Sequence, residues 1–279
     1  MSYFLANHIL KIGTEQTITG EEVVHIAQAR RIKVGEHINL QGPDLRRFNT
    51  QVITVNRHTI TVKVLEEIEP PPEPTLKVIL FQALVHEQAL DYILQKSTEL
   101  GAATIVIFPS ANTPTQFHGE RLMHKLERWQ KITLEAAKQC DRLLPPTIEF
   151  LGSFEEATAR AQNCSRIFVL DSHGTQTFSQ LHNSPQPPLT LRGGDRSIPP
   201  LSDRGGSALG GKIRGGEGGV MNDTLALFVG PEGGFTTEEF ESLKALPHAT
   251  AVRMGPRILR TETAATSAIA IVQTLWGDM

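Results

Sequence analysis

Residues 225–276, LALFVGPEGGFTTEEFESLKALPHATAVRMGPRILRTETAATSAIAIVQTLW, contain the same local plan twice. Leu225 to Val229 is an apolar run that is too short for a helix and ends at a Gly-Pro pair, which is typical of a strand buried on both faces. Thr250 to Met254 reads as a second strand, and it also ends at a Gly-Pro pair. Each strand therefore leads into a glycine-bearing loop and then into a helix.

The two helices that follow these loops have different start signals. Thr236 followed by Glu239 is a capping-box pattern, which predicts a helix through about Lys244. Thr261 is the predicted N-cap of the second helix, which is rich in Ala and Ile. The two loops are therefore expected to lie side by side at one end of the strands, where α/β proteins bind ligands.

The loops are rich in glycine, at Gly230, Gly233, Gly234 and Gly255. Without a Cβ these residues leave backbone N–H and C=O groups uncovered, and such groups can bind the edge of a purine. Either loop alone is equally well explained as an ordinary tight turn. Together they are a more specific signal.

Composition and charge narrow the class of protein. The chain has 279 residues, enough for two domains, and a formal net charge of −3, which gives no overall support to nucleic-acid binding. Any RNA contact must then use local basic groups, such as Arg30, Arg31 and Lys33, or Arg46 with Arg47, although such clusters are usually just solvated.

Several other classes are disfavoured by the sequence. No apolar run approaches the ~20 residues that span a bilayer, and the N-terminus lacks a secretory pattern, so we expect a cytoplasmic protein without a membrane segment. Cys140 and Cys164 have no metal-ligand spacing, and no metal is expected. No Rossmann or P-loop glycine motif is present.

The N-terminal part of the chain predicts a small, mostly β domain. Thr19 and Glu22 form a capping-box pattern that predicts a helix through about Ala29. Segments of β-formers lie between turn residues. The predicted strands are Ile38 to Leu40, Thr50 to Val55 and His58 to Val64.

The proline-rich segment EPPPEP at residues 69–74 predicts a stiff linker, because proline fixes φ. Strands and helices alternate after it, which predicts an α/β domain with a mainly parallel sheet. We therefore divide the chain into residues 1–72 and 73–279. The predicted strands are Leu76 to Leu84, Thr104 to Phe108, Thr147 to Leu151 and Ile167 to Leu170, and the predicted helices are Glu87 to Leu100, Glu120 to Gln139, one capped by Ser153 and Glu156, and one near Phe178 to Leu181.

Residues 183–223 interrupt the second domain with a low-complexity segment that contains three Arg-Gly-Gly triplets. It has too little apolar surface to offset the entropy lost on ordering, so it predicts a flexible insertion. It could add non-specific RNA contacts, or be a tolerated surface expansion.

Five motifs together resemble the RsmE family. They are GPEGGF at 230–235, MGPRILRTETA at 254–264, QKSTELG at 95–101, EAAKQCDR at 135–142, and His25 followed by the basic segment from Arg30 to Glu36. The resemblance covers nearly the whole chain. It implies a SPOUT-class methyltransferase that uses S-adenosylmethionine to methylate N3 of a uridine in 16S ribosomal RNA of the small subunit. It also implies a PUA-like RNA-binding β-barrel, a C-terminal α/β domain with a trefoil knot, and a homodimer.

The resemblance also assigns site residues. Binding of RNA would involve the basic segment of the first domain and a polar set in the second, although Lys96, Gln139 and Arg142 could equally form salt bridges and polar contacts on helix surfaces. The implied RNA-binding residues are Arg30, Arg31, Lys33, Lys96, Gln139 and Arg142. The implied cofactor-binding residues are Leu170, Gly230, Pro231, Glu232, Gly233, Gly234, Phe235, Met254, Gly255, Ile258, Leu259, Arg260 and Thr261.

Methylation of uridine N3 requires removal of the N3 proton, because N3 is protonated at neutral pH. Arg260 is the first candidate for stabilising the uracil anion, with Glu232 or Glu262 as second choices. Arg260 and Glu262 could instead form an ion pair that only braces the loop. The sequence does not identify the catalytic base.

Two segments depart from the family pattern. Val85-His86 stands where a Lys-Gly pair is usual, and residues 110–116 lack an arginine-bearing motif, so the RNA-facing surface is open to question. Two alternative functions therefore remain: a non-catalytic RNA-binding factor associated with the ribosome, and a SPOUT enzyme that acts on another RNA.

Overall fold

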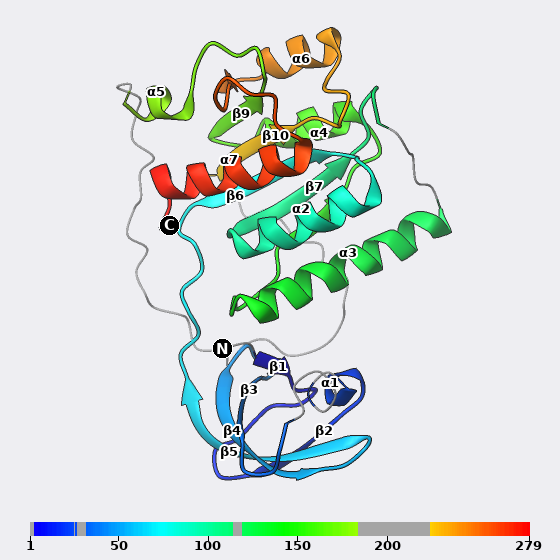
Figure 1. Cartoon of the computed structure of the whole chain (residues 1–279), viewed down its shortest axis with the longest axis vertical. Helices are drawn as coiled ribbons and strands as arrows, with labels where there is room; N and C mark the ends of the chain where they lie inside the picture. Colours follow the sequence, from blue (N-terminus) through cyan, green and yellow to red (C-terminus); the bar gives the residue numbers. More distant parts are fainter. Residues whose placement is uncertain (1–2, 25, 27–31, 114–118, 184–223) are drawn as a thin grey trace.

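The computed structural model describes residues 3–24, 26, 32–113, 119–183 and 224–279. The described chain forms two separate β-sheets, one below the other in Figure 1, with helix α3 between them. The first sheet contains strands β1 to β5 and the second contains β6 to β11. The molecule is thus a mixed α/β protein with two sheets, as the sequence predicts.

The first sheet is mostly antiparallel, with the strand order β1-β3-β4-β5-β2. Apolar residues at alternate positions, such as Ile60, Val62 and Val64, are fully buried in its own hydrophobic core. Its elements are β1 (Tyr3–Leu5), β2 (Glu15–Thr19), α1 (Glu21–Val24), β3 (His37–Gln41), β4 (Arg47–Val55) and β5 (Thr59–Ile68).

The second sheet is parallel throughout, with the order β11-β9-β10-β6-β7-β8. Its strands are β6 (Lys77–Ala83), β7 (Ala102–Phe108), β8 (Thr147–Phe150), β9 (Arg166–Leu170), β10 (Thr224–Val229) and β11 (Ala249–Val252). Its helices are α2 (Glu87–Glu99), α3 (Glu120–Gln139), α4 (Phe154–Ala161), α5 (Phe178–Asn183), α6 (Thr237–Lys244) and α7 (Thr261–Trp276).

Helices cover both faces of this sheet. Along β6, Val78 and Leu80 pack with α2, α3, α5 and α7, whereas Ile79 and Phe81 pack with α4 and α6. Successive residues of a strand point to opposite faces, so both faces of a central strand must be apolar here. This explains why the central strands read as continuous apolar runs rather than as alternating ones.

The capping box that begins α6 is confirmed in full. The backbone N–H of Glu239 donates to Thr236 Oγ1 at 3.2 Å, and the N–H of Thr236 donates to Glu239 Oε2 at 2.9 Å. At α4, Ser153 accepts from the N–H of Glu156, while the Glu156 carboxylate accepts from the N–H of Gly152. The sequence signal for both helix starts is therefore correct.

Three sequence predictions are wrong in detail. Thr261 is the first residue of α7, and Arg260 is the N-cap, with no capping bond from its side chain. Thr19 is the last residue of β2 and does not cap α1, which begins at Glu21. The strand predicted to reach Met254 ends two residues earlier, at the end of β11.

Parts of other predictions fall outside the described residues. The helix predicted through Ala29 is described only over α1, and the insertion at 183–223 lies outside the described chain except for Asn183, the last residue of α5. Among the helices that the structure describes, none combines the length and the apolar character needed to cross a membrane.

The two sheets are held together around the turn that follows α3. Arg47 of β4, which is 1% exposed, donates to Asp141 Oδ1 at 2.6 Å and to the carbonyl of Arg142 at 3.2 Å. Its guanidinium lies over the ring of Tyr3, 4.0 Å from the ring centroid. The prediction of a basic RNA-contacting patch at Arg46 and Arg47 is therefore wrong for Arg47, whose charge is used inside the protein.

Candidate functional site

The site that the sequence indicates lies where four parallel strands end. Val252 of β11 is paired with Leu170 of β9, and Val229 of β10 is paired with Gln82 of β6. Because β9, β10 and β6 are neighbours and all run in one direction, the loops after these strands leave from the same edge of the sheet. The two glycine loops are thus brought together, as predicted.

A buried threonine joins the two loops directly. Thr261, the first residue of α7 after the second loop, donates its Oγ1 hydrogen to the carbonyl of Gly230, at the start of the first loop, at 2.8 Å. The same oxygen accepts from Gln82 Nε2 at 3.2 Å. Thr261 is only 6% exposed, so these hydrogen bonds are shielded from water. The position of one loop therefore depends on the position of the other.

The first loop, residues 230–235, folds tightly on itself. The N–H of Gly234 donates to the carbonyl of Pro231 at 2.9 Å, and Gly234 has φ +70°. A Cβ on Gly230 would lie 3.3 Å from the nitrogen of Phe235, which is closer than a side chain usually approaches. Asn112 donates from Nδ2 to the carbonyl of Gly234 at 3.0 Å and so holds the loop from outside.

Phe235 directs its ring into the protein. The ring stacks against Phe108, with centroids 6.5 Å apart, and meets the ring of Phe154 edge-on at 6.1 Å. Phe235 therefore anchors the first loop to the core beneath α4 and α6. Its ring is used in this packing, so its backbone is the part that it contributes to the loop surface.

The second loop, residues 253–260, is more open. Gly255 has φ +90°, and a Cβ built there would meet no atom within 4 Å. The backbone N–H groups of Gly255, Ile258 and Leu259 donate no hydrogen bond to any of the described residues. Ile258 is 84% exposed. The loop thus keeps unused donors and an apolar side chain at the surface.

The three predicted catalytic residues lie in different surroundings. Arg260 is exposed and its Nη1 lies 4.0 Å from Glu262 Oε1, so the two form a loose ion pair. Glu232 accepts a hydrogen bond at Oε1 from the N–H of His86, at the start of α2. The Glu232 carboxylate therefore holds the first loop against α2, where it also meets the positive end of the helix dipole.

The predicted RNA-binding residues have different contacts. Lys96 forms an ion pair with Glu99 at 2.8 Å. This is the salt bridge on the helix surface that the sequence offered as the alternative to an RNA contact. Lys33 is exposed, and Arg30 and Arg31 lie outside the described residues. Gln139 is exposed at the end of α3.

Arg142, which the resemblance implies as an RNA contact, has several partners within the protein. Its side chain is 12% exposed and binds Glu73 at 2.8 Å, and its Nη1 donates to the carbonyls of Thr98 and Ala102. The Glu73 carboxylate also accepts from the N–H of Leu143. Arg142 thus fastens the linker segment to the second sheet instead of presenting its charge to solvent.

The two segments that depart from the family pattern border the first loop. Val85 is 3% exposed and packs in the core, while His86 donates its N–H to Glu232. Ser110 is 8% exposed, and its N–H donates to Thr113 Oγ1 at 2.7 Å. Residues 114–118 lie outside the described chain. The described parts of both departures therefore include residues that bind the first loop, His86 in one and Asn112 in the other.

Sequence reasoning missed Gln82 and Asn112 as supports of the loops. Gln82 is fully buried in β6, and its Oε1 has no hydrogen-bond partner among the described residues. The sequence signal that could have identified Gln82 was a glutamine inside an otherwise apolar strand, because a buried amide needs polar partners. Asn112 lies in a loop without a recognisable pattern, so no sequence signal marked it.

The remaining titratable candidates do not point to other chemistry. Burial raises the pKa of both thiols, Cys140 and Cys164, so neither is activated as a thiolate nucleophile. Within the described chain, no three His, Cys, Asp or Glu side chains come close enough to hold a metal ion.

Comparisons with known proteins agree with this geometry. A family model described as an RNA methyltransferase domain matches residues 71–194 and 212–273. The ribosomal RNA small subunit methyltransferase E of Bacillus subtilis (strain 168) is 29% identical over 271 residues, which cover 94% of this chain and 92% of that protein.

Two solved structures have the same fold along nearly the whole chain. The ribosomal RNA small subunit methyltransferase E from Neisseria gonorrhoeae, bound to S-adenosyl methionine, is 25% identical, with a TM-score of 0.76 and coverage of 100% of this chain and 99% of that one. A methyltransferase from Legionella pneumophila in complex with the cofactor SAM is 23% identical, with a TM-score of 0.77 and coverage of 99% and 98%.

Proposed function

The chain belongs to the RNA methyltransferase family, and we propose that it uses S-adenosylmethionine to methylate N3 of a uridine in 16S ribosomal RNA. The observation that carries this proposal is the hydrogen bond between Thr261 and Gly230, which joins two loops with uncovered backbone groups at one sheet edge. The relatives named ribosomal RNA small subunit methyltransferase E support the choice of substrate.

The residues present fit the cofactor. Unused N–H donors on Gly255, Ile258 and Leu259 suit the acceptors of an adenine, and Ile258 offers apolar surface. The buried Oε1 of Gln82, which has no partner among the described residues, adds an acceptor beside Thr261. We assign cofactor binding to Leu170 and to the two loops, mainly through their backbone atoms.

S-Adenosylmethionine supplies an electrophilic methyl group on a sulfonium centre, so the protein mainly has to position the acceptor and stabilise charge. Arg260 is exposed at the end of the second loop, and its guanidinium can stabilise negative charge on a uracil deprotonated at N3. Glu262 lies within 4.0 Å of Arg260 and can orient it. We place Glu232 in a supporting role, because its carboxylate is bound to α2.

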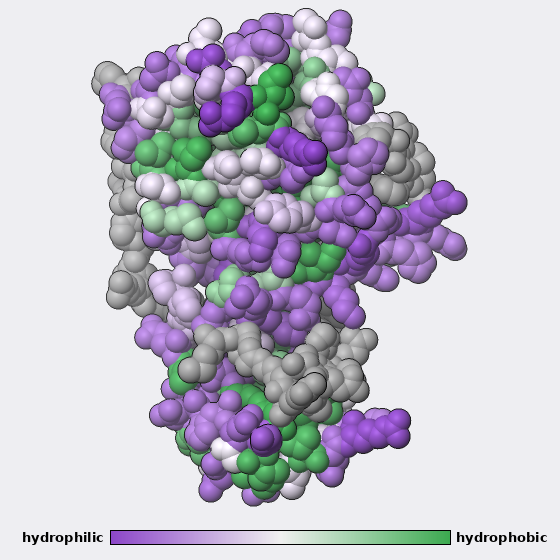
Figure 2. Space-filling view, viewed as in Figure 1, coloured by the Kyte–Doolittle hydropathy of each residue, from purple (hydrophilic) through white to green (hydrophobic). Residues whose placement is uncertain are grey.

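We further propose two domains, with residues 1–72 as a PUA-like RNA-binding barrel and 73–279 as a SPOUT domain with a trefoil knot. The separate hydrophobic cores of the two sheets support this division. A homodimer is also proposed. It is supported by half-buried apolar residues of α7, such as Ile271 and Leu275. Hydrophobic and hydrophilic surface alternate in the region of α7 (Figure 2). We also propose a cytoplasmic location, which the proposed ribosomal RNA substrate supports.

The proposed reaction is tested with the purified chain and small ribosomal subunits from cells that lack the corresponding gene. We expect S-adenosylmethionine uptake by calorimetry and a single methylated uridine, located by nuclease digestion and mass spectrometry. A non-catalytic RNA-binding factor would bind RNA without taking up the cofactor. A methyl group on another RNA would reassign the substrate.

The role of Arg260 is tested with two variants. Arg260→Ala should lower kcat by about 10²–10³-fold, as loss of one charge-stabilising donor usually does, with cofactor affinity unchanged. Glu262→Gln removes the ion pair and keeps the arginine. If Glu262→Gln loses as much activity as Arg260→Ala, the pair only braces the loop and the assignment is overturned.

A further inference from the structure

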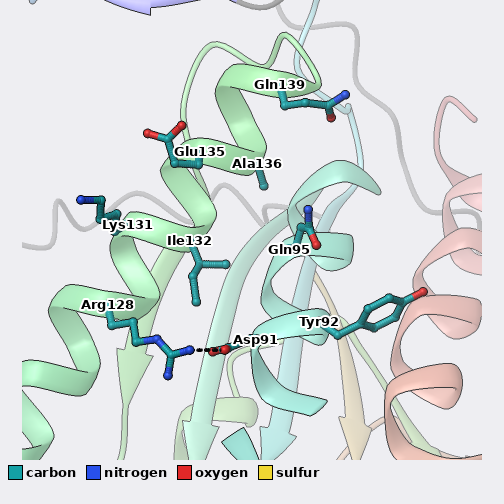
Figure 3. Close-up of a pocket in the computed structure, with 9 residues that line it drawn as sticks. All are labelled: Asp91, Tyr92, Gln95, Arg128, Lys131, Ile132, Glu135, Ala136 and Gln139. Atoms are coloured by element: carbon teal, nitrogen blue, oxygen red, sulfur yellow. Dashed lines mark hydrogen bonds and ion pairs between the residues drawn. The ribbon is translucent and has the colours of Figure 1, made fainter. Parts of the chain in front are cut away.

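A pocket of about 610 Å³ lies between α2 and α3, outside the two loops (Figure 3). Ile132 and Ala136 of α3 face α2 across it, and Asp91 of α2 reaches Arg128 of α3. Its size is in the range of pockets that hold small ligands. The lining residues are Asp91, Tyr92, Gln95, Arg128, Lys131, Ile132, Glu135, Ala136 and Gln139.

The two helices that line the pocket connect to the candidate cofactor loops at one end and to the first sheet at the other. Asp91 lies in the first turns of α2, whose start is bonded to the first loop through the N–H of His86 and the carboxylate of Glu232. At the other end, Gln139 is the last residue of α3, two residues before Asp141, which Arg47 of the first sheet binds. A strand of RNA that contacts both the loops and the N-terminal domain would pass along this surface.

The charges in the lining cancel. The lining contains two carboxylates, Asp91 and Glu135, and two cationic side chains, Arg128 and Lys131. It also contains the amide groups of Gln95 and Gln139. Phosphate binding favours an excess of positive charge, which this pocket lacks. Mixed donors and acceptors over an apolar floor suit an uncharged planar group such as a nucleobase.

One buried atom makes the chemistry more specific. Asp91 Oδ2 is bound by Arg128 Nη2, whereas Asp91 Oδ1 is buried and accepts no hydrogen bond among the described residues. A buried carboxylate oxygen without a partner is costly, and an amino group is a suitable donor for it. Carboxylates accept hydrogen bonds from the amino group of cytosine in this way.

We propose that the pocket between α2 and α3 binds an amino-bearing base of the single-stranded RNA segment that flanks the methylated uridine. The proposal rests on the proposed function and adds a second point of recognition to it. Specific RNA recognition commonly uses bases that are unstacked and hydrogen-bonded on their edges. The pocket would fix the register of the RNA, while the target uridine is held at the two loops.

The test compares steady-state methylation by the full-length wild type and by two pocket variants. We expect Asp91→Asn and the double variant Gln95→Ala with Gln139→Ala to raise KM for the RNA about tenfold. Asp91→Asn keeps the shape of the side chain and replaces one carboxylate oxygen with a donor. Both variants should keep the wild-type kcat at saturating RNA and the wild-type affinity for S-adenosylmethionine. Gln162→Ala, on the exposed end of α4, is the matched control and should leave KM unchanged.

A second measurement maps zero-length ultraviolet crosslinks between the wild type and its RNA by mass spectrometry. Crosslinks from a cytosine, adenine or guanine to peptides of α2 or α3 support the proposal. Unchanged KM in both variants, or crosslinks only elsewhere, would overturn it while wild-type turnover keeps the proposed function intact. Variants that change the molecular mass in light scattering but not KM would assign the pocket to a second copy of the chain and also overturn it. Absence of wild-type methylation would instead refute the proposed function.

Discussion

Single polar side chains in the interior decide how the candidate site is held. The hydroxyl of Thr261 bonds the carbonyl of Gly230 and accepts from Gln82, so a residue with an ordinary appearance in sequence connects two loops and a central strand. The exposed charges nearby have more freedom, as Arg260 with its loose pair to Glu262 shows. The buried contacts therefore fix geometry, and the exposed ones are available for chemistry.

Thr261→Val tests the connection between the loops. The substitution keeps the shape but leaves the Gly230 carbonyl and one Gln82 hydrogen without a partner, which should lower the free energy of unfolding by about 1–3 kcal/mol. Calorimetry should also show weaker binding of S-adenosylmethionine, because the loops can separate. Thr274→Val is the control, since its exposed hydroxyl bonds only the carbonyl of Ala270 in the same helix. Equal effects of the two substitutions would contradict the proposed connection.

Tyr3 gives the protein a pH dependence at high pH. Burial raises the pKa of Tyr3 to about 12, and the nearby Arg47 charge opposes this rise. The folded state thus holds the phenol proton more tightly than the unfolded state, in which the pKa is about 10. This contribution is fully present below pH 10 and is lost as the pH rises toward 12.

Urea unfolding of the wild type and of Tyr3→Phe between pH 9 and 11.5 measures this effect. The free energy of unfolding of the wild type should fall by roughly 1–3 kcal/mol more than that of the variant, which has no phenol to titrate. Other tyrosine and lysine groups titrate equally in both proteins, so they cancel in the comparison. Parallel pH curves would show that Tyr3 makes no such contribution.

At the scale of elements, hydrogen bonds at the N-termini of helices hold the first loop in place. The capping box of α6 fixes the residues that follow the first loop, and Glu239 Oε1 also accepts from the N–H of Ala111 at 2.7 Å. Loop and helix start are therefore one hydrogen-bonded unit. The N-terminus of α2 is attached to the same loop by Glu232.

Thr236→Ala should separate the structural and functional effects of this cap. Loss of an N-cap hydroxyl lowers stability by about 1 kcal/mol, and here it should also weaken cofactor binding, because Thr236 directly follows the first loop. Ser153→Ala removes the N-cap hydroxyl of α4, which makes no hydrogen bond to either loop among the described residues, and is the matched control. Thermal unfolding should show similar losses for both, while calorimetry shows weaker cofactor binding only for Thr236→Ala. The idea fails if both variants bind the cofactor like the wild type.

At the scale of the whole molecule, the two sheets act as one unit because buried charges join them. Arg47 of the first sheet binds Asp141 and the carbonyl of Arg142, while Lys138 of α3 pairs with Glu22 of α1 at 2.7 Å. Glu73 of the proline-rich segment holds Arg142. The orientation of the first sheet is therefore set at the end of α3, beside the pocket.

Arg47→Met should uncouple the sheets. Removing one member of a buried pair costs about 3 kcal/mol, and RNA affinity should fall while cofactor affinity is kept, because the loops lie in the second domain. Arg46→Met is a matched control, since its partner Glu67 is exposed and such pairs contribute less than about 1 kcal/mol. Chemical denaturation and RNA-binding titrations measure both effects. If Arg47→Met binds RNA like the wild type, the junction does not position the N-terminal domain.

Local sequence patterns were enough to predict the alternation of strands and helices, the two glycine loops after β10 and β11, and the capping box of α6. These features depend on residues close in the chain: periodic burial, φ at glycine and proline, and hydrogen bonds over three residues. Their boundaries were less certain, and Thr261 was predicted as a cap although it begins α7.

The roles of the charged and polar side chains became evident only from their arrangement in the folded protein. Arg47 and Arg142 read as surface cations, but each is used inside the protein, and Glu232 supports α2. Gln82 becomes informative only when Thr261, distant in sequence, lies against it. The physical reason is that the role of a charge or an amide depends on its burial and on its partners in space, and the local pattern of a chain contains neither.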